Sequence, residues 1–495
     1  MTTCRSPKET DPVIIVGGGL AGLSAALEII SSPKANTKVV IFEKEKSFGG
    51  NSIKASSGIN ACGTEIQKLN SIKDSVDLFI ADTLKGGDNE NDHALVDFLA
   101  RNSVDSLKFL MDNGVFIDDV NLCGGHSVPR THWAHLKDGK PIPIGLSIIN
   151  ALKGKINEIS EKNPGLVEIH LNAEVLGLTT WNEYITGIRY KDVENATEVK
   201  EYTGKAVILT TGGFSADKNS ENSLLNEFGD SKLLKDLPTT NGAFADGSGI
   251  KMARAMGAEL IGMENIQIHP TTFIDPNDKD AMTKFLAAEA LRGKGAILLT
   301  EKGKRFANEL GRRDYLSDKI FEECQITKDN KNIAFMLLND DSVQGFGSTA
   351  FAFYWKVKKF FKQVNSLAEL SSVLGCDQET LQNTLLSYNK AADQGKDEFG
   401  KTVFPTKFDV KKPFYVAKIT PGIHYSMGGL KINSHGKVFN SDNQAYFNGL
   451  YAAGEITGGV HGKNRLAGNS LLECVVFGRS SGKSASTLKY GHQEL

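Results

Sequence analysis

The sequence lacks the features that mark membrane, secreted and metal-cluster proteins. Its six cysteines stand at positions 4, 62, 123, 324, 376 and 474, and no two of them have a CxxC spacing. This scatter argues against a haem-attachment motif, a cysteine metal cluster and a disulfide framework, and it favours a reducing compartment. No run of about 18 apolar residues is present, so the sequence predicts no transmembrane helix. The first ten residues are polar and lack the apolar core of a secretory signal.

The chain also lacks an excess of charge of one sign. Its net charge is −2 over 495 residues, so no global field indicates nucleic acid or an anionic membrane as a partner. Fifty glycines against 13 prolines favour tight turns and close backbone approaches over disorder. The length allows two or three domains. The short polar N-terminus favours the cytoplasm as the compartment, with the mitochondrion as the alternative.

A dinucleotide-binding pattern is present near the N-terminus. Residues 11–16 predict a buried strand, and GGGLAG at residues 17–22 leads from it into an apolar helix. In this setting the first glycine permits a tight turn, the second lets the backbone approach a pyrophosphate, and the third allows close helix–strand packing. A glycine-rich turn without a ligand is the alternative. The pattern predicts cofactor contacts at Gly17, Gly19, Ala21 and Gly22.

The residues after the second predicted strand distinguish FAD from NAD. That strand, residues 38–42, ends in Glu43, whose carboxylate can accept hydrogen bonds from ribose hydroxyls. Residues 49–60 form a small, polar segment that can lie along a long cofactor and bond to its phosphates, ribityl chain and flavin ring. Asp246 opens another predicted helix and is a further candidate. Predicted FAD contacts in this part are Glu43, Asn51, Ser52, Ser57, Gly58 and Asp246.

Residues 450–482 combine a cofactor signal with a substrate signal. A short apolar strand turns at Gly454 and Glu455 into a glycine-rich loop that carries Arg465, and an apolar helix starts at residues 468–470. A loop that ends at a helix N-terminus offers free N–H groups and a positive dipole end, which suit an anionic or electron-rich ligand. Further predicted FAD contacts are Glu455, Ser470 and Leu471.

The middle of the chain departs from the nucleotide-binding pattern between about residues 264 and 425. We therefore expect an α/β fold in which a Rossmann-like FAD-binding domain, residues 11–263 and 426–495, carries an inserted α+β capping domain, residues 264–425. The active site is expected at the interface, where closure of the cap excludes water.

Four segments in or beside this insert complete a pattern. They are QIHPT at 267–271, AAEALRG at 287–293, GKRFANELGRRD at 303–314 and HYSMGG at 424–429. Together with residues 450–482 they closely resemble flavocytochrome c and the soluble, single-chain fumarate reductases, within the fumarate reductase/succinate dehydrogenase flavoprotein family. The resemblance extends from about Val13 to the last helix. It implies FAD as the cofactor and fumarate and succinate as substrate and product.

The resemblance also implies a role for individual residues. The family positions that bind the dicarboxylate match His269, His424, Arg465 and Gly468, the last through its backbone. The general acid and its proton relay match Arg313, Glu289 and Arg292. The residue types suit this chemistry, because fumarate is a planar dianion and the guanidinium fork can bind both oxygens of a carboxylate. His126, in a loop similar to one that faces the active site in the family, is a weaker candidate.

The chain departs from the family pattern at three places. Flavocytochrome c has a threonine beside the relay glutamate where this chain has Ala288, which leaves the specificity for fumarate open. Many family members attach FAD through a histidine in the segment that aligns with Asn51, so we expect non-covalent FAD. Because the CxxCH haem motif is missing, no haem or iron–sulfur partner is required, and electrons are expected from NADH or a reduced free flavin.

The favoured hypothesis is an FAD-dependent oxidoreductase acting on CH–CH groups, of the fumarate reductase (NADH) type. The two histidines together with Arg313 favour a dicarboxylate reductase. Within the same family, a reductase of another unsaturated acid or an aspartate oxidase-like enzyme is the alternative, and the missing flavin-attachment histidine disfavours a succinate dehydrogenase subunit. A catalytically idle flavin-binding protein is the alternative from a different class.

Overall fold

The structure is a computed structural model of the chain. The residues that it describes are 6–32, 37–134, 143–194, 198–218, 221–234, 236–324, 326 and 332–490. The first five residues of the polar N-terminal segment lie outside this part. Among the described residues, no helix has the length and apolar character needed to cross a membrane.

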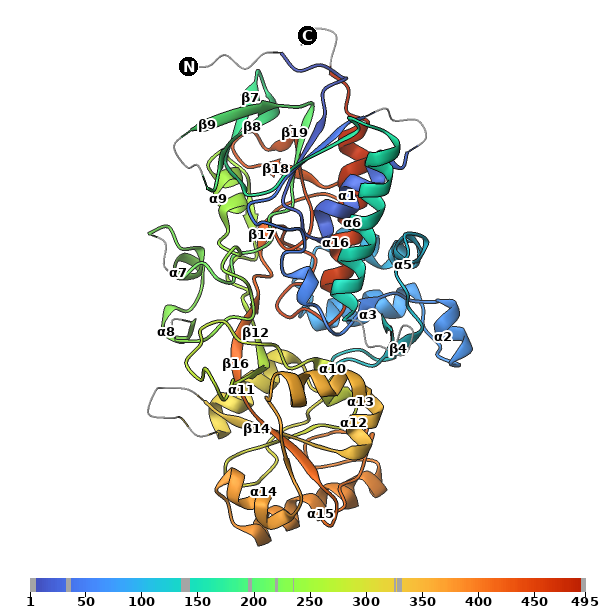
Figure 1. Cartoon of the computed structure of the whole chain (residues 1–495), viewed down its shortest axis with the longest axis vertical. Helices are drawn as coiled ribbons and strands as arrows, with labels where there is room; N and C mark the ends of the chain where they lie inside the picture. The colour runs from blue at the N-terminus through green and yellow to red at the C-terminus, as the bar shows by residue number, and fades with distance from the viewer. Residues whose placement is uncertain are drawn as a thin grey trace.

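A mixed sheet forms the core of the upper half of the molecule in Figure 1. Its parallel centre consists of β2 (Val39–Phe42), β1 (Val13–Val16), β10 (Ala206–Leu209) and β19 (Ala445–Ala452). The first three of these strands are short, wholly apolar and buried, as expected for parallel strands covered on both faces. The remaining strands of the sheet are β6 (Val167–His170), β7 (Ala173–Trp181), β8 (Tyr184–Asp192), β9 (Val199–Thr203) and β18 (Lys437–Asn440).

Three helices pack together beside this sheet, and they come from distant parts of the sequence. They are α1 (Leu20–Ile30), α6 (Ile144–Lys162) and α16 (Asn469–Ser486), which lie side by side in Figure 1. A Cβ atom at Gly478 of α16 would lie 2.5 Å from the main-chain oxygen of Ala21. Glycine at this position is therefore what allows the first and last helices to approach so closely.

Smaller elements surround the carboxyl ends of the parallel strands. A three-stranded sheet contains β3 (Ile59–Asn60), β4 (Asp119–Asn121) and β5 (Thr131–Trp133), and β11 (Leu260–Ile261) pairs with β17 (Gly429–Leu430). The helices are η1 (Ser52–Lys54), α2 (Glu65–Leu69), α3 (Val76–Gly86), α4 (His93–Arg101), α5 (Ser103–Asp112), α7 (Leu224–Phe228), α8 (Ser231–Leu234) and α9 (Ser248–Arg254).

A second, antiparallel sheet forms the lower half of the molecule in Figure 1. Its strands are β12 (Gln267–Phe273), β13 (Ile297–Leu299), β14 (Ala334–Asn339), β15 (Lys362–Val364) and β16 (Phe414–Tyr425). Its helices are α10 (Glu289–Gly293), α11 (Arg313–Glu323), α12 (Asp340–Phe346), α13 (Ser348–Ala352), η2 (Phe353–Val357), α14 (Leu367–Leu374) and α15 (Gln378–Gln394). We call this part the cap; the exact domain boundaries at 264 and 425 stay a prediction.

Both faces of the cap sheet are covered by apolar side chains. Along β14, Met336 and Leu338 belong to one apolar cluster, whereas Phe335 and Leu337 belong to another. Side chains that alternate between two clusters are what a central strand with two buried faces requires. The cap thus has a hydrophobic core of its own on each face of this sheet.

The pairing of β12 with β16 joins the cap to the rest of the molecule. The two strands run antiparallel to each other along the connection between the cap and the mixed sheet in Figure 1. Gln267 pairs with Tyr425 and His269 with Gly422, and register shifts interrupt the ladder on both sides of Ile268–His269. The pairing therefore brings the QIHPT and HYSMGG segments to the same place.

Candidate active site

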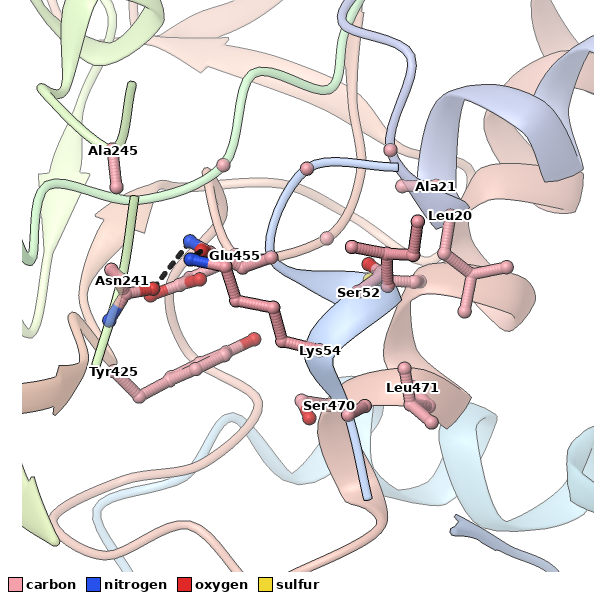
Figure 2. A pocket seen from close by; sticks show the side chains of 18 of the residues that line it. Leu20, Ala21, Ser52, Lys54, Asn241, Ala245, Tyr425, Glu455, Ser470 and Leu471 are labelled. Atoms are coloured by element: carbon pink, nitrogen blue, oxygen red, sulfur yellow. Dashed lines mark hydrogen bonds between the residues drawn. The ribbon is translucent and has the colours of Figure 1, made fainter. Parts of the chain in front are cut away.

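A cavity of about 620 Å³ lies at the carboxyl ends of the parallel strands and extends to the cap. Residues from the ends of β1, β2 and β10, from the N-terminus of α16 and from the cap line it. Figure 2 shows side chains from several of these segments around the cavity. Open α/β sheets bind ligands at this end of their strands. The cavity is therefore the candidate cofactor site.

Most of the residues predicted to contact the cofactor do line this cavity. They are Gly17, Gly19, Ala21, Glu43, Asn51, Ser52, Ser57, Gly58, Glu455, Ser470 and Leu471. Gly22 is not among the lining residues, and a Cβ there would lie 2.1 Å from the main-chain oxygen of Gly17, so it acts through close packing.

Asp246 is a further residue that the sequence predicts as a cofactor contact. This carboxylate does not line the cavity. Lys44 Nζ, which belongs to a lining residue, lies 2.7 Å from Asp246 Oδ2, and the N–H of Ser248 donates to Oδ1. Asp246 is therefore bonded to two residues that line the cavity, Lys44 and Ser248.

The glycine turn before α1 offers an open backbone to the cavity. Gly17 has φ +107°, and a Cβ there would lie 2.5 Å from the main-chain oxygen of Thr210. A Cβ at Gly19 would meet no protein atom within 4 Å, and Gly19 caps α1 without a side-chain hydrogen bond. The first N–H groups of α1 are thus available to an anionic group.

Glu43 both shapes this turn and lines the cavity. Its Oε2 accepts a 2.7 Å hydrogen bond from the N–H of Gly18, and its Oε1 accepts one from the N–H of Glu45. Burial raises the pKa of Glu43, although both hydrogen bonds oppose that change. Each carboxylate oxygen keeps a lone pair for a ribose hydroxyl.

The start of α16 closes the other side of the cavity. Gly468 has φ +85° and precedes α16 without a side-chain cap, and a Cβ there would lie 2.2 Å from Asn60 Oδ1. Glu455 lies nearby, where Ser426 donates to its Oε1 from both N–H and Oγ. Burial raises the pKa of Glu455 to about 7. Within the described residues, the buried hydroxyl of Thr211, a lining residue, has no hydrogen-bond partner.

These features fit FAD. The open N–H groups of α1 suit its pyrophosphate, Glu43 suits a ribose, and the polar segment 50–58 lines the path towards α16. The unpartnered Thr211 hydroxyl and the uncapped N-terminus of α16 are available to polar atoms of the flavin end. The residues present can therefore hold the whole cofactor.

The two predicted histidines meet at the cap end of the cavity. The ring centroids of His269 and His424 are 5.2 Å apart. The main-chain N–H of Thr271 donates to Nδ1 of His269, so the ring proton resides on Nε2, and that buried nitrogen has no hydrogen-bond partner among the described residues. Burial, reinforced by neighbouring arginines, lowers the pKa of both histidines well below 6.5. They are neutral hydrogen-bonding groups.

Arg313 and Glu289 form a buried ion pair. Nε and Nη2 of Arg313 each lie 3.0 Å from Glu289 Oε2, and the N–H of Gly124 donates to Glu289 Oε1. Burial acts to raise the pKa of Glu289, but Arg313 and Arg292 outweigh it and hold this pKa at about 2. Arg292 Nη2 is 3.7 Å from Glu289 Oε2. The i, i+3 spacing noted in the sequence thus places Glu289 and Arg292 on the same face of α10.

Arg465 lies against an aromatic ring in the cavity wall. Its guanidinium carbon is 4.3 Å from the centroid of Tyr425, and Nη1 donates to Ser470 Oγ over 3.1 Å. Burial and the charge of Arg313 lower the pKa of Arg465 to about 10. Its Nε is buried without a hydrogen-bond partner in the described part of the chain. This nitrogen is available to a carboxylate.

The predicted catalytic set therefore divides into two groups. Arg313, His424, Arg465 and Gly468 line the cavity, whereas His269, Glu289 and Arg292 lie directly behind it. Gln267 connects the groups, since its Oε1 accepts from Arg313 Nη1 over 2.6 Å and its Nε2 donates to the main-chain oxygen of Arg465.

Sequence reasoning missed Gln267 and Tyr425. The signal for Gln267 was its position two residues before His269 in a strand, which puts both side chains on one face. Tyr425 donates to Glu473 Oε2, which also bonds to His461. The weaker candidate His126 does not line the cavity; its Nε2 contacts the main-chain oxygen of Ala467, and Arg130 contacts its Nδ1.

The fold and the site define an FAD-binding flavoprotein with a polar reaction centre under a cap. Residues 12–471 match the family described as FAD binding domain, and the chain belongs to it. The predicted fold class and FAD as the cofactor are confirmed.

Proteins similar to this chain narrow the family further. It is 37% identical to the fumarate reductase of Schizosaccharomyces pombe over 96% of this chain and 89% of that protein. It is 38% identical to fumarate reductase 1 of Saccharomyces cerevisiae, over 96% and 98%. An NADH:fumarate oxidoreductase of Klebsiella pneumoniae is 34% identical over 97% of this chain and 48% of that protein.

Among solved structures, the open conformation of a flavocytochrome c3 fumarate reductase has a TM-score of 0.74 and 31% identity. The match covers 97% of this chain and 79% of that one. The chain belongs to the fumarate reductase family of flavoproteins. It is an FAD-dependent oxidoreductase acting on CH–CH groups.

Proposed function

We propose that the protein reduces fumarate to succinate with non-covalently bound FAD. The observation that carries this proposal is the arrangement of Arg313, Arg465 and His424, which line one cavity with the FAD-binding residues. Asn51 stands where many relatives attach the flavin, and its amide bonds to Asn241. An amide forms no covalent bond to the flavin.

The substrate dianion would bind between the cap and the start of α16. One carboxylate is assigned to Arg465 and to the backbone at Gly468. The Nε of Arg465 has no hydrogen-bond partner among the described residues and can donate to this carboxylate. The other is assigned to His424, which lines the cavity, and to His269 directly behind it, whose Nε2 has no hydrogen-bond partner among the described residues; both rings are neutral. Neutral histidines avoid an excess of buried positive charge before the substrate arrives.

When bound in its reduced form, FAD supplies a hydride, and one proton from the protein completes the change of the C=C bond of fumarate into the CH2–CH2 of succinate. We assign that proton to Arg313. Arginine has an ordinary pKa above about 12, so it gives up a proton only to a strongly basic carbon and must regain one quickly. Glu289, 3.0 Å from two nitrogens of Arg313, is the proposed route for its return, with Arg292 beside it.

The electron donor is proposed to be NADH or a reduced free flavin. The name of the Klebsiella relative supports NADH, but this chain spans only 48% of that protein. No haem or iron–sulfur partner is needed in this scheme. The cytoplasm remains the proposed compartment, with the mitochondrion as the alternative, and closure of a cap formed by residues 264–425 is the proposed means of excluding water.

A reductase of another unsaturated acid is the second candidate function. Ala288 is fully buried directly before α10, where flavocytochrome c has a threonine. The missing hydroxyl leaves one hydrogen-bond donor fewer at the start of α10. An aspartate oxidase-like activity has no comparable observation in its favour.

Anaerobic reoxidation of the flavin tests the proposal. The reduced holoprotein is mixed with fumarate, and flavin absorbance and succinate are followed together. Fast reoxidation with one succinate per flavin supports fumarate reduction, and Arg313→Ala should abolish it. A response only to other unsaturated acids supports the second candidate. No reoxidation by any acid indicates an idle flavin-binding protein.

A further inference from the structure

A cluster of four buried charged side chains lies in the cap, outside the cofactor cavity. Glu309 and Lys401 are fully buried, and the side chains of Arg305 and Asp397 are 7% and 4% exposed. Two cations balance two carboxylates, and none of the four lines the cavity. A buried ion cluster is weak evidence for stability alone, because apolar side chains of similar shape often serve as well.

Glu309 is at the centre of this cluster. Its carboxylate accepts from Arg305 Nε over 2.7 Å and from Nη2 over 2.8 Å, and Lys401 Nζ donates over 2.8 Å. Arg305 also contacts Asp397 at 2.9 Å and lies 4.9 Å from the ring centroid of Tyr388. Such a two-pronged guanidinium–carboxylate pair fixes the glutamate in position and orientation.

The main chain of Glu309 connects the cluster to the relay. Its carbonyl oxygen accepts a 2.7 Å hydrogen bond from Arg292 Nη1. Among the described residues, Nε and Nη2 of Arg292 have no hydrogen-bond partner although they are buried. Nη2 instead faces Glu289 Oε2 at 3.7 Å. Among the described residues, the hydrogen bond to the carbonyl oxygen of Glu309 is thus the one that fixes the guanidinium group of Arg292.

We propose that Glu309, fixed by Arg305 and Lys401, is a positioning residue that holds Arg292 against Glu289. This inference rests on the proposed function, in which Arg292 and Glu289 return a proton to Arg313. The cluster touches no reacting atom and acts through one carbonyl group. A displacement of about 1 Å in a catalytic arrangement can cost about 100-fold in rate.

Three lysine substitutions test this role. Lys401→Met removes one of the charged donors to Glu309, and Lys401→Arg keeps the charge. Lys407→Met is the matched control. Lys407, like Lys401, follows α15, but its ion pair with Asp393 is exposed. The measurements are reoxidation of the reduced flavin by saturating fumarate in H2O and D2O, succinate affinity from flavin absorbance, and thermal unfolding.

Lys401→Met is expected to slow reoxidation about tenfold or more and to increase its solvent isotope effect, with succinate affinity changed less than about twofold. Lys401→Arg and Lys407→Met should stay near the wild type. A merely structural role would lower stability without changing the isotope effect. Unchanged rate and isotope effect in folded Lys401→Met would overturn the inference.

Two further variants keep the test decisive. If Lys401→Met does not fold, the charge-balanced double variant Lys401→Met/Glu309→Gln replaces it, with the same expected rate loss and isotope effect. Arg292→Ala is measured in parallel. A slow Arg292→Ala beside a normal Lys401 variant rejects only the positioning role, whereas a normal Arg292→Ala rejects the proton relay of the proposed function.

Discussion

The substitution Glu289→Gln separates the charge of the relay carboxylate from its shape. In the structure Glu289 Oε2 is 3.0 Å from two nitrogens of Arg313 and 3.7 Å from Arg292. The amide oxygen of glutamine can still accept the hydrogen bond from the N–H of Gly124. What the variant loses is the negative charge and the ability to take up and release a proton.

The expected loss of stability follows from the pKa of Glu289. Arg313 and Arg292 hold it at about 2 against an ordinary value of 4.5, even though burial acts in the opposite direction. That difference corresponds to about 3 kcal/mol of folding free energy. A similar size, about 3–5 kcal/mol, is typical when one partner of a buried ion pair is removed. Because the folded pKa is depressed, this stability is present above pH 4.5 and is lost as the pH falls towards 2.

Two assays follow from this reasoning. Chemical denaturation at pH 7 should show Glu289→Gln less stable by about 3 kcal/mol, with less acid dependence between pH 4.5 and 2 than the wild type. Reoxidation of the reduced flavin by fumarate should slow by about 100-fold to 10,000-fold, which is the usual contribution of a positioned acid–base group. Substrate affinity should not fall, since the site becomes more positive.

The exposed Glu322→Gln, on the same helix as Arg313 and paired with Lys319, is the matched control and should behave as the wild type. A Glu289→Gln variant with wild-type reoxidation rates would refute the assignment of the relay. A variant with normal stability would refute the electrostatic account of the ion pair.

Three further predictions address the cavity wall and the start of α10. Ala288→Thr should lower the KM for fumarate about twofold to tenfold, as one added hydrogen bond would, and an unchanged KM would show that no hydroxyl is needed there. Tyr425→Leu should raise the KM for fumarate about tenfold through loss of the stacking on Arg465, whereas Tyr425→Phe should not; equal effects would point to the hydroxyl instead. The FAD-free protein should lose stability as the pH rises from 4.5 through 7, because burial raises the pKa of Glu455 to about 7 and the neutral acid is the form that folding favours. Thermal unfolding of Glu455→Gln should not show this fall, and an identical pH profile would assign it to another group.

Local patterns allowed much of the cofactor site to be predicted. The turn at Gly17 and the uncapped start of α1 depend on backbone rules that a short stretch of sequence reveals. The structure places Asp246 outside the cavity lining, paired with Lys44, which lies 202 residues away in the sequence. A short sequence pattern cannot reveal an ion pair between residues that are so far apart in the sequence.

The same limit applies to the reaction centre. The contact between Glu289 and Arg313 followed from a resemblance, whereas the contacts of Gln267 join residues that are 46 and 198 positions apart, which its place beside His269 in a strand does not reveal. Of the two cations that bind the carboxylate of Glu309, Arg305 is four residues away, but Lys401 lies 92 residues further along the chain. The segment 303–314 therefore shows the family resemblance but does not reveal that Glu309 binds Lys401 or that its carbonyl oxygen binds Arg292.

The packing of α1 against α16 has a consequence for biosynthesis. A ribosome makes the glycine turn and α1 more than 430 residues before it makes α16. Until α16 emerges, the apolar face of α1 lacks its packing partner, and the flavin end of the cavity lacks the wall that Gly468, Ser470 and Leu471 provide. A nascent chain without α16 therefore lacks part of the wall of the FAD site, so full enclosure of the cofactor follows the synthesis of α16.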